Sequence, residues 1–249
     1  MNESWRALML GRGAIASIAL ALAVAIGIAM PLEAQQKPAQ GGAADAKASV
    51  EAPVYKPPLR GAPGGRVGGG TRGTGAEQAF VLSVLAPNHT GLTVSEQPAL
   101  FWFISKPSSY PVELTFVDPQ KTEPLIEQRL DPPVAAGIHK VRLSDHGIRL
   151  APGVPYQWYV AVVPDTARRS KDILAGGTIE RIASPADLAA KLSSAPKTQV
   201  PSLYAQAGLW YDALGALGDL IDQAPQDGSL RDQRSALLRQ VGLPGTNGN

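Results

Sequence analysis

The residues whose types could carry chemistry are few and lie far apart. The chain has no cysteine and three histidines, His89, His139 and His146. Ser144, Asp145 and His146 are adjacent, whereas the members of a Ser-His-Asp triad normally come from separate segments, so we interpret Ser144 and Asp145 as turn formers. His139 and His146 could share a metal ion, but two basic residues lie between them and Asp145 is the only carboxylate close by. We therefore expect no catalytic residue, no metal site, no cofactor and no enzymatic activity.

A glycine-rich segment holds the other candidates for a binding site. Residues 64–73 read GGRVGGGTRG, and three arginines recur at intervals of six, Arg60, Arg66 and Arg72. A P-loop needs Gly-Lys-Ser/Thr at the start of a helix, but here no lysine follows and a strand comes next. Two interpretations stay open. The segment is a flexible lead-in with ordinary surface contacts, or its arginines meet an anionic partner such as lipid head groups or an acidic protein face.

The overall charge does not favour a nucleic-acid partner. The chain has 23 Lys and Arg against 21 Asp and Glu, a formal net charge of +2, which is far from the basic surface that nucleic-acid binders carry. Because cysteine is absent, neither a disulfide framework nor a thiolate metal site is possible. Stability must come from an apolar core.

The N-terminus has the pattern of a targeting segment. Two arginines precede an uncharged and mostly apolar run over residues 13–30. We predict a Sec signal peptide over residues 1–34, cleaved after Ala34. Leu32 fits the small-residue position before that site poorly, so an uncleaved anchor remains the alternative, and membrane contact is expected only through it. In both cases the rest of the chain is exported, and we expect a periplasmic or secreted protein.

Composition divides the remainder into four parts. Residues 35–76 are rich in Gly, Pro and Ala, and we predict a disordered tether there. We expect a β-sandwich domain over residues 77–183, a helical segment packed on it over residues 184–243, and a disordered tail over residues 244–249.

The central strand of the predicted sandwich lies in the segment LAPGVPYQWYVAVV, residues 150–163. From Tyr156 onward its apolar residues alternate with period 2, and the preceding Pro-Gly turn is typical of a tyrosine corner. Breaker residues separate the strands that we predict: Ala79–Ala86, Ala99–Ser105, Val112–Val117, Leu125–Leu130, Gly137–Leu143, Tyr156–Val163 and Gly177–Ile182. We predict a mainly β fold, an antiparallel sandwich like immunoglobulin or fibronectin type III domains. Trp102 and Trp158 are expected to pack in its core, or else to line a ligand groove.

The C-terminal pattern is helical. Ser184 could cap a helix that runs to about Ser194. The sequence predicts another helix over Leu230–Val241. Between them, residues 202–225 resemble one tetratricopeptide-like helical hairpin. A single unit cannot bury its own apolar face, so it must lean on the sandwich, on a neighbouring helix or on another molecule. If its turn is exposed, it offers an interaction anchor formed by Leu209, Trp210 and Tyr211.

A series of motifs resembles one protein family. The motifs are PPLRGAPGGRVGGGTRG (57–73), LTVSEQPALFWFIS (92–105), GIHKVRL (137–143), PYQWYV (155–160), RRSKD (168–172), GTIER (177–181) and YAQAGLWYDAL (204–214). In this order they resemble the bacterial, largely cyanobacterial, secreted family catalogued as domain of unknown function 928, which implies no established activity. Many members carry a cysteine after the glycine-rich frame and another after the long central strand. Gly75 and Pro164 stand near these places here, so the resemblance implies no disulfide that would hold the lead-in segment.

Two functions follow as expectations. The first is a non-catalytic protein-interaction module of the cell envelope, with an envelope protein as its partner. The alternative is a domain that binds carbohydrate or a small ligand, which a cluster of aromatic side chains on a solvent-facing sheet face would support.

Overall fold

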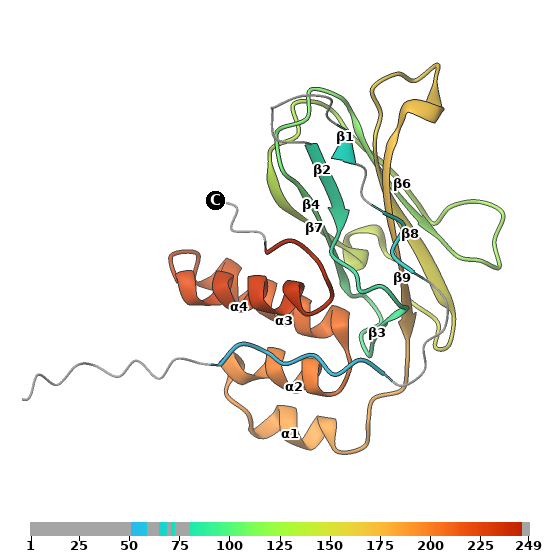
Figure 1. The fold of residues 1–249 in the computed structure, drawn as a ribbon. Helices are drawn as coiled ribbons and strands as arrows, with labels where there is room; N and C mark the ends of the chain where they lie inside the picture. The colour runs from blue at the N-terminus through green and yellow to red at the C-terminus, as the bar shows by residue number, and fades with distance from the viewer. Residues whose placement is uncertain (1–50, 59–64, 69–70, 73–79, 246–249) are drawn as a thin grey trace, which may run out of the picture. The chain divides into compact units, whose positions relative to one another are not determined.

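The computed structural model describes residues 51–58, 65–68, 71–72 and 80–245 (Figure 1). All of them belong to one structural unit, residues 46–249. The predicted signal peptide lies outside the described residues. Within the described part of the chain, no helix has both the length and the apolar character to span a membrane.

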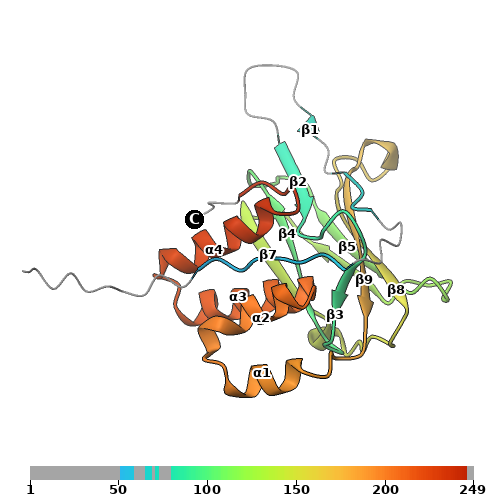
Figure 2. The same ribbon diagram turned by 60° about the horizontal axis from the view of Figure 1, so that its bottom comes forward.

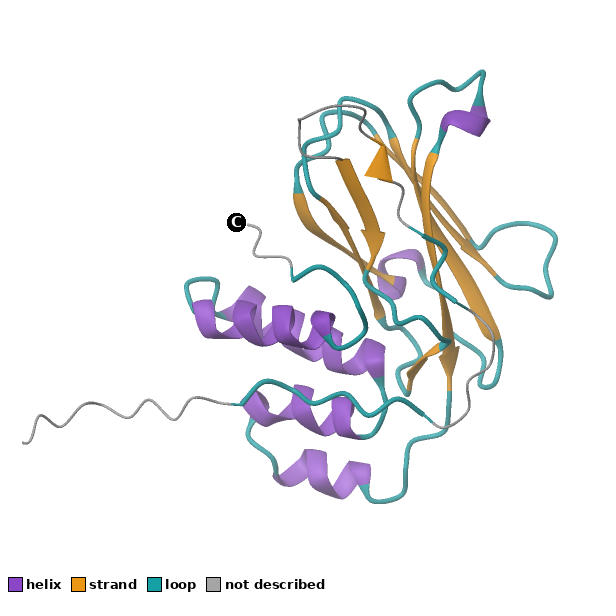
Figure 3. Ribbon diagram, viewed as in Figure 1, coloured by secondary structure: helices purple, strands orange, loops and turns teal. Residues whose placement is uncertain are grey.

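Two β-sheets form the body of this unit (Figure 3). One has the order β1-β2-β4-β7, with β1 Thr71–Arg72, β2 Phe80–Val84, β4 Ala99–Ile104 and β7 Gly137–Arg142. The other has the order β3-β9-β8-β5-β6, with β3 Gly91–Thr93, β9 Ile173–Arg181, β8 Pro155–Val162, β5 Val112–Val117 and β6 Ile126–Leu130. The β3–β9 pair is parallel, so the second sheet is mixed and not antiparallel as predicted. The prediction missed β3, which has three residues and no visible period.

The core includes residues of the C-terminal helices, such as Leu214 and Leu237. It also fills the space between the inner faces of the two sheets. Alternate residues of β8 are buried there as the period-2 pattern predicted, and Trp158 pairs with Phe116 of the adjacent strand. The hydrogen bond expected of a tyrosine corner, between the tyrosine hydroxyl and the backbone just upstream, is present. The Ala151 N–H donates to the hydroxyl of Tyr156 over 3.1 Å. Trp102, on β4, is buried on the same inner side.

Four C-terminal α-helices follow the strands among the described residues. They are α1 Leu188–Ser194, α2 Val200–Gln206, α3 Trp210–Gln223 and α4 Gly228–Arg239. Figure 2 shows α3 and α4 in front of the four-stranded sheet, and Phe101 on the outer face of β4 lies against Gly218 of α3. Strand and helix content are about equal, so the prediction of a mainly β fold is wrong in this respect. The predicted Ser184 cap is also wrong, because α1 begins after Asp187 and has no side-chain cap.

The start of α3 is inserted at the end of the sandwich. The Trp158 indole N–H donates to the Tyr211 hydroxyl over 3.0 Å, and that hydroxyl donates to the Thr178 carbonyl over 3.1 Å. The indole N–H of Trp210 donates to the Leu85 carbonyl over 2.8 Å. A Cβ on Gly91 would lie 2.5 Å from the Tyr211 ring, so β3 can pass this close only with glycine. These contacts fix the helices on both sheets.

Residues 51–58 lie across the helices as an extended strap (Figure 1). The side-chain amide of Gln240 accepts the Tyr55 N–H and donates to the Pro53 carbonyl, each over 2.8 Å. The Lys56 N–H donates to the Ala205 carbonyl over 3.0 Å, and the Tyr55 ring packs edge-on against Trp210 with centroids 5.0 Å apart.

A second lead-in stretch pairs with the five-stranded sheet. Val67 forms an antiparallel bridge with Gly176 of β9. The prediction of a disordered tether over residues 35–76 therefore fails for residues 51–58, 65–68 and 71–72. For residues 51–58 and 65–68 the sequence carried no sign of this order, because partners such as Gln240 for Tyr55 and Gly176 for Val67 lie more than a hundred residues away along the chain. Residues 71–72 pair with the nearby strand β2.

We predict that Tyr211→Phe lowers the free energy of unfolding by about 1–3 kcal/mol. The substitution keeps the packed ring but leaves the buried indole N–H of Trp158 without its acceptor. Urea unfolding of the full chain measures the effect. The matched control is Tyr110→Phe, whose side chain is 48% exposed and whose hydroxyl loss should change the free energy by less than about 0.5 kcal/mol. Equal effects of the two substitutions would contradict the proposed role of the hydroxyl.

Candidate functional site

The predicted anchor residues are not exposed. Leu209, Trp210 and Tyr211 have 0%, 0% and 1% of their surface accessible, because they form the N-cap and first turn of α3, where it enters the end of the sandwich. The condition for an exposed interaction anchor is therefore not met. The same large aromatic side chains that favour protein interfaces are used here to join two layers of one unit.

The structure describes the three arginines of the glycine-rich segment to different extents, and it assigns contacts to Arg66 alone among them. Arg66 is half-buried, and its guanidinium donates to the carbonyls of Ala86, Val241 and Gly242 over 3.3–3.5 Å. Burial lowers its pKa. Two of these carbonyls follow the C-terminal end of α4, where a cation is favourable, so Arg66 acts within the fold. Arg60 lies outside the described residues, and for Arg72 only the backbone, in β1, is described.

The histidines and their neighbours do not converge. Ser144, Asp145 and His146 form a short 3₁₀ turn in which Ser144 donates to Asp145 over 3.2 Å. His139 stacks on Trp102 with ring centroids 4.0 Å apart, and His89 bonds the Tyr55 hydroxyl over 2.9 Å. No group of three or more potential metal ligands occurs in the part of the chain that the structure describes.

The sheet faces carry no aromatic cluster in the described ranges. Trp102, Trp158 and Trp210 are all buried, and Tyr110 is the large aromatic side chain that is most exposed among these residues. The aromatic platform that would support carbohydrate binding is thus not formed by these residues.

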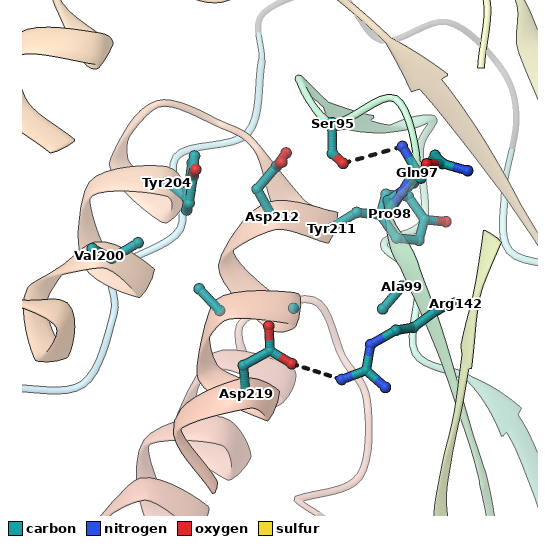
Figure 4. A pocket seen from close by; sticks show the side chains of 12 residues that line it. Ser95, Gln97, Pro98, Ala99, Arg142, Val200, Tyr204, Tyr211, Asp212 and Asp219 are labelled. Atoms are coloured by element: carbon teal, nitrogen blue, oxygen red, sulfur yellow. Dashed lines mark hydrogen bonds and ion pairs between the residues drawn. The ribbon is translucent and has the colours of Figure 1, made fainter. Parts of the chain in front are cut away.

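A groove between the helices and the sheet edge combines several polar groups (Figure 4). The α2–α3 hairpin forms one wall, and the β3–β4 turn with the start of β4 and the end of β7 forms the other. Its volume is about 340 Å³. The residues that line it are Ser95, Gln97, Pro98, Ala99, Arg142, Val200, Tyr204, Tyr211, Asp212, Gly215, Ala216 and Asp219.

Asp212, in the first turn of α3, is the main polar residue at one end of the groove. Its Oδ2 accepts the Val94 N–H over 3.0 Å, and its carboxylate also takes hydrogen bonds from the Thr93 side chain and the Ser95 backbone. Burial raises its pKa to about 6 in spite of these bonds, which act in the opposite direction. The carboxylate therefore fixes the β3–β4 turn to α3 and can change its charge near neutral pH.

The rest of the groove has polar side chains and one open position, Gly215. The hydroxyl-bearing ring of Tyr204 faces the groove from α2, and burial, followed by the charge of Asp212, raises its pKa. At the opposite end, Arg142 of β7 bonds Asp219 of α3 over 3.1 Å. A Cβ added at Gly215 would meet no atom within 4 Å. The groove is thus open at the middle of α3 and polar at both ends.

The sequence analysis did not identify this groove. Asp212 and Tyr204 lie within the YAQAGLWYDAL motif, and an acidic residue among apolar ones in a helix's first turn was the available signal. Its partners, however, lie 118 residues earlier, and only the tertiary fold brings them together.

We predict a distinct pH dependence for Asp212→Asn. Because the folded-state pKa of about 6 lies above the ordinary value of 3.8, the folded protein holds this proton more tightly than the unfolded chain does. The resulting stabilisation is complete below pH 3.8 and is lost as the pH rises through about 6. The free energy of unfolding of the wild type minus that of Asp212→Asn should fall by about 2 kcal/mol between those limits, less than the full pKa shift because the groove admits solvent. Urea unfolding across this pH range measures it, and a flat or rising difference would contradict it.

Comparison with known proteins supports a family assignment. No curated protein and no solved structure is significantly similar to the chain. One family model matches residues 67–247, which include both sheets, the four helices and the groove. The chain belongs to the family described as Domain of Unknown Function (DUF928).

Proposed function

We propose that this protein is a non-catalytic protein-interaction module of the cell envelope, and that the groove between the α2–α3 hairpin and the β4–β7 edge binds an extended segment of its partner. The observation that carries the proposal is the open space beside Gly215, between polar groups at both ends of the groove. An extended peptide needs hydrogen-bonding groups along its path and room for side chains. The envelope location rests on the predicted signal peptide.

The strap supports the same mode of binding. The helical layer already holds the extended strap, residues 51–58, through the two hydrogen bonds of the Gln240 side-chain amide and the carbonyl of Ala205. These are sequence-independent backbone contacts of the kind that peptide-binding domains use. In this proposal the two sheets serve as an immunoglobulin- or fibronectin-like scaffold, and α2 and α3 serve as a tetratricopeptide-like hairpin that presents the groove.

Binding of a small ligand is the second candidate. The groove volume of about 340 Å³ falls within the range of small-ligand pockets. A ligand of this class would contact Asp212 and Tyr204, so a polar molecule with hydrogen-bond donors fits better than an apolar one.

We predict that a photoreactive residue at position 216 cross-links a defined envelope protein in cells, and that Gly215→Trp reduces this product about tenfold. The added side chain occupies the groove, while its Cβ meets no atom within 4 Å outside its own helix backbone, and tryptophan has a higher helix propensity than glycine, so the helix is not weakened. The full chain is expressed with benzoylphenylalanine at position 216, and the cross-linked products are identified by mass spectrometry.

Two matched controls use Asp232, on the exposed side of α4. A photoreactive residue at position 232 tests whether the cross-link is specific to the groove, and Asp232→Trp tests whether any added tryptophan disturbs it. Asp232→Trp should leave the cross-link at position 216 unchanged. If Gly215→Trp also leaves it unchanged, the groove is not the binding site. If position 216 yields no protein product but native mass spectrometry shows a small molecule that Gly215→Trp removes, small-ligand binding replaces the proposal.

A further inference from the structure

Strand β6 is an edge strand with a self-complementary sequence. It is the last strand in the order β3-β9-β8-β5-β6, at the opposite end of the sheet from β3, which lies beside the helices (Figure 1). Its residues 126–130 read IEQRL, and Glu127 and Arg129 are exposed. Unpaired edges of this kind are templates for another strand unless they are protected.

The ladder shows which backbone groups of β6 point outward. The Val163 N–H donates to the Pro111 carbonyl, so Val112 and Val162 form a non-hydrogen-bonded pair between β5 and β8. Alternation then directs the backbone groups of Val112, Leu114 and Phe116 toward β6. Their partners in β6, at positions 126, 128 and 130, use their backbone groups within the sheet. The N–H and C=O groups of Glu127 and Arg129 consequently face away from β5, and no hydrogen bond joins these groups to another described residue.

One pairing register of two β6 strands matches their charges. If two copies pair antiparallel about a two-fold axis at Gln128, each Glu127 lies opposite Arg129 of the other copy, and Ile126 lies opposite Leu130. The outward backbone groups of Glu127 and Arg129 then form the hydrogen-bonded pairs, as the ladder geometry requires. A shift by two residues in either direction would place Glu127 opposite Glu127, or Arg129 opposite Arg129, and like charges opposite each other are destabilising.

The charges beside β6 extend this pattern. On the outer face of the same sheet, Arg169 bonds Glu113 through two contacts of 3.2 and 2.6 Å, and Glu113 lies 3.7 Å from Arg129 on the neighbouring strand. A Glu127 from a second copy would continue the series on the far side of Arg129. The signs then alternate from Arg169, in the short 3₁₀ helix before β9, across β5, β6 and the β6 strand of the second copy. A hollow of about 550 Å³ lined by Thr115, Glu127 and Arg129, among others, leaves room for the incoming side chains.

We propose that β6 is a homotypic docking edge, where two copies of this chain pair antiparallel about Gln128 and join their five-stranded sheets into one. The pairing is specified by the two Glu127–Arg129 contacts. Asp131, Pro132 and Pro133 follow β6 directly, and because proline cannot donate to a ladder, they confine the pairing to a short stretch. A contact of this size gives a weak dimer that local concentration in an envelope would favour.

The absence of cysteine makes a direct test possible. Gln128→Cys places one thiol of each copy at the two-fold axis, in a non-hydrogen-bonded pair whose Cα atoms would be about 4.5 Å apart, within the range that a disulfide spans. We expect mild oxidation of the full chain to give a covalent dimer. Adding Glu127→Arg should reduce its yield about tenfold by placing like charges opposite each other, and adding Arg129→Glu to that variant should restore it.

The control is Asp232→Cys, which reports random collisions of an exposed thiol on α4. The proposal is overturned if Gln128→Cys yields no more dimer than Asp232→Cys, or if the charge reversal has no effect. A second measurement avoids any disturbance by the new thiol. In the cysteine-free chain, Glu127→Pro removes an outward N–H that the fold does not use, so sedimentation velocity should show loss of the dimer with an unchanged melting temperature. A dimer that persists in this variant also overturns the proposal, and neither result depends on the occupant of the groove.

Discussion

The hydroxyl of Tyr211 is the contact on which the relative placement of helices and sheets depends. It accepts a hydrogen bond from Trp158 in the core and donates one to Thr178 of β9, so one side-chain oxygen from α3 satisfies two buried groups of the sandwich. Buried polar groups are costly unless paired. The position of α3 in turn determines where the strap and α4 can pack, because Trp210 contacts Tyr55, and Gln240, just beyond α4, holds the strap backbone.

This arrangement explains why the conspicuous aromatic residues do not act as an interaction anchor. A lone helical hairpin must bury its apolar face somewhere, and Trp210 and Tyr211 bury it against the chain's own sheets and lead-in segment. The same residue types at the same spacing would suit an interface with another protein. In this chain, Gly91 lies directly under the Tyr211 ring and the Leu85 carbonyl accepts the Trp210 indole N–H. These contacts favour packing within the chain over an interface with another protein.

Much of the fold was predictable, because it depends on local periodicity. The alternation in β5 and β8, the continuous apolar run of β4, the turn before Tyr156 and the change to helices after β9 were all visible in the sequence. The parallel strand β3, the strap and the groove were not. Each depends on a contact between distant residues, such as Asp212 with Val94 or Tyr55 with Gln240. Arg66 shows the same limit, since its partners are backbone carbonyls that carry no sequence signal.

The two proposed surfaces lie apart in the topology, and this has a physical consequence. The groove borders the β3–β4 turn, whereas β6 is at the opposite end of the five-stranded sheet, so pairing through β6 leaves the groove of each copy open. A dimer joined through its five-stranded sheets would then present two grooves, one from each copy. For a partner with two binding segments, or for partners held close together in an envelope, the second contact becomes intramolecular, and weak individual contacts give a much stronger combined attachment. In such a dimer, each groove would bind weakly and reversibly while the assembly stays attached.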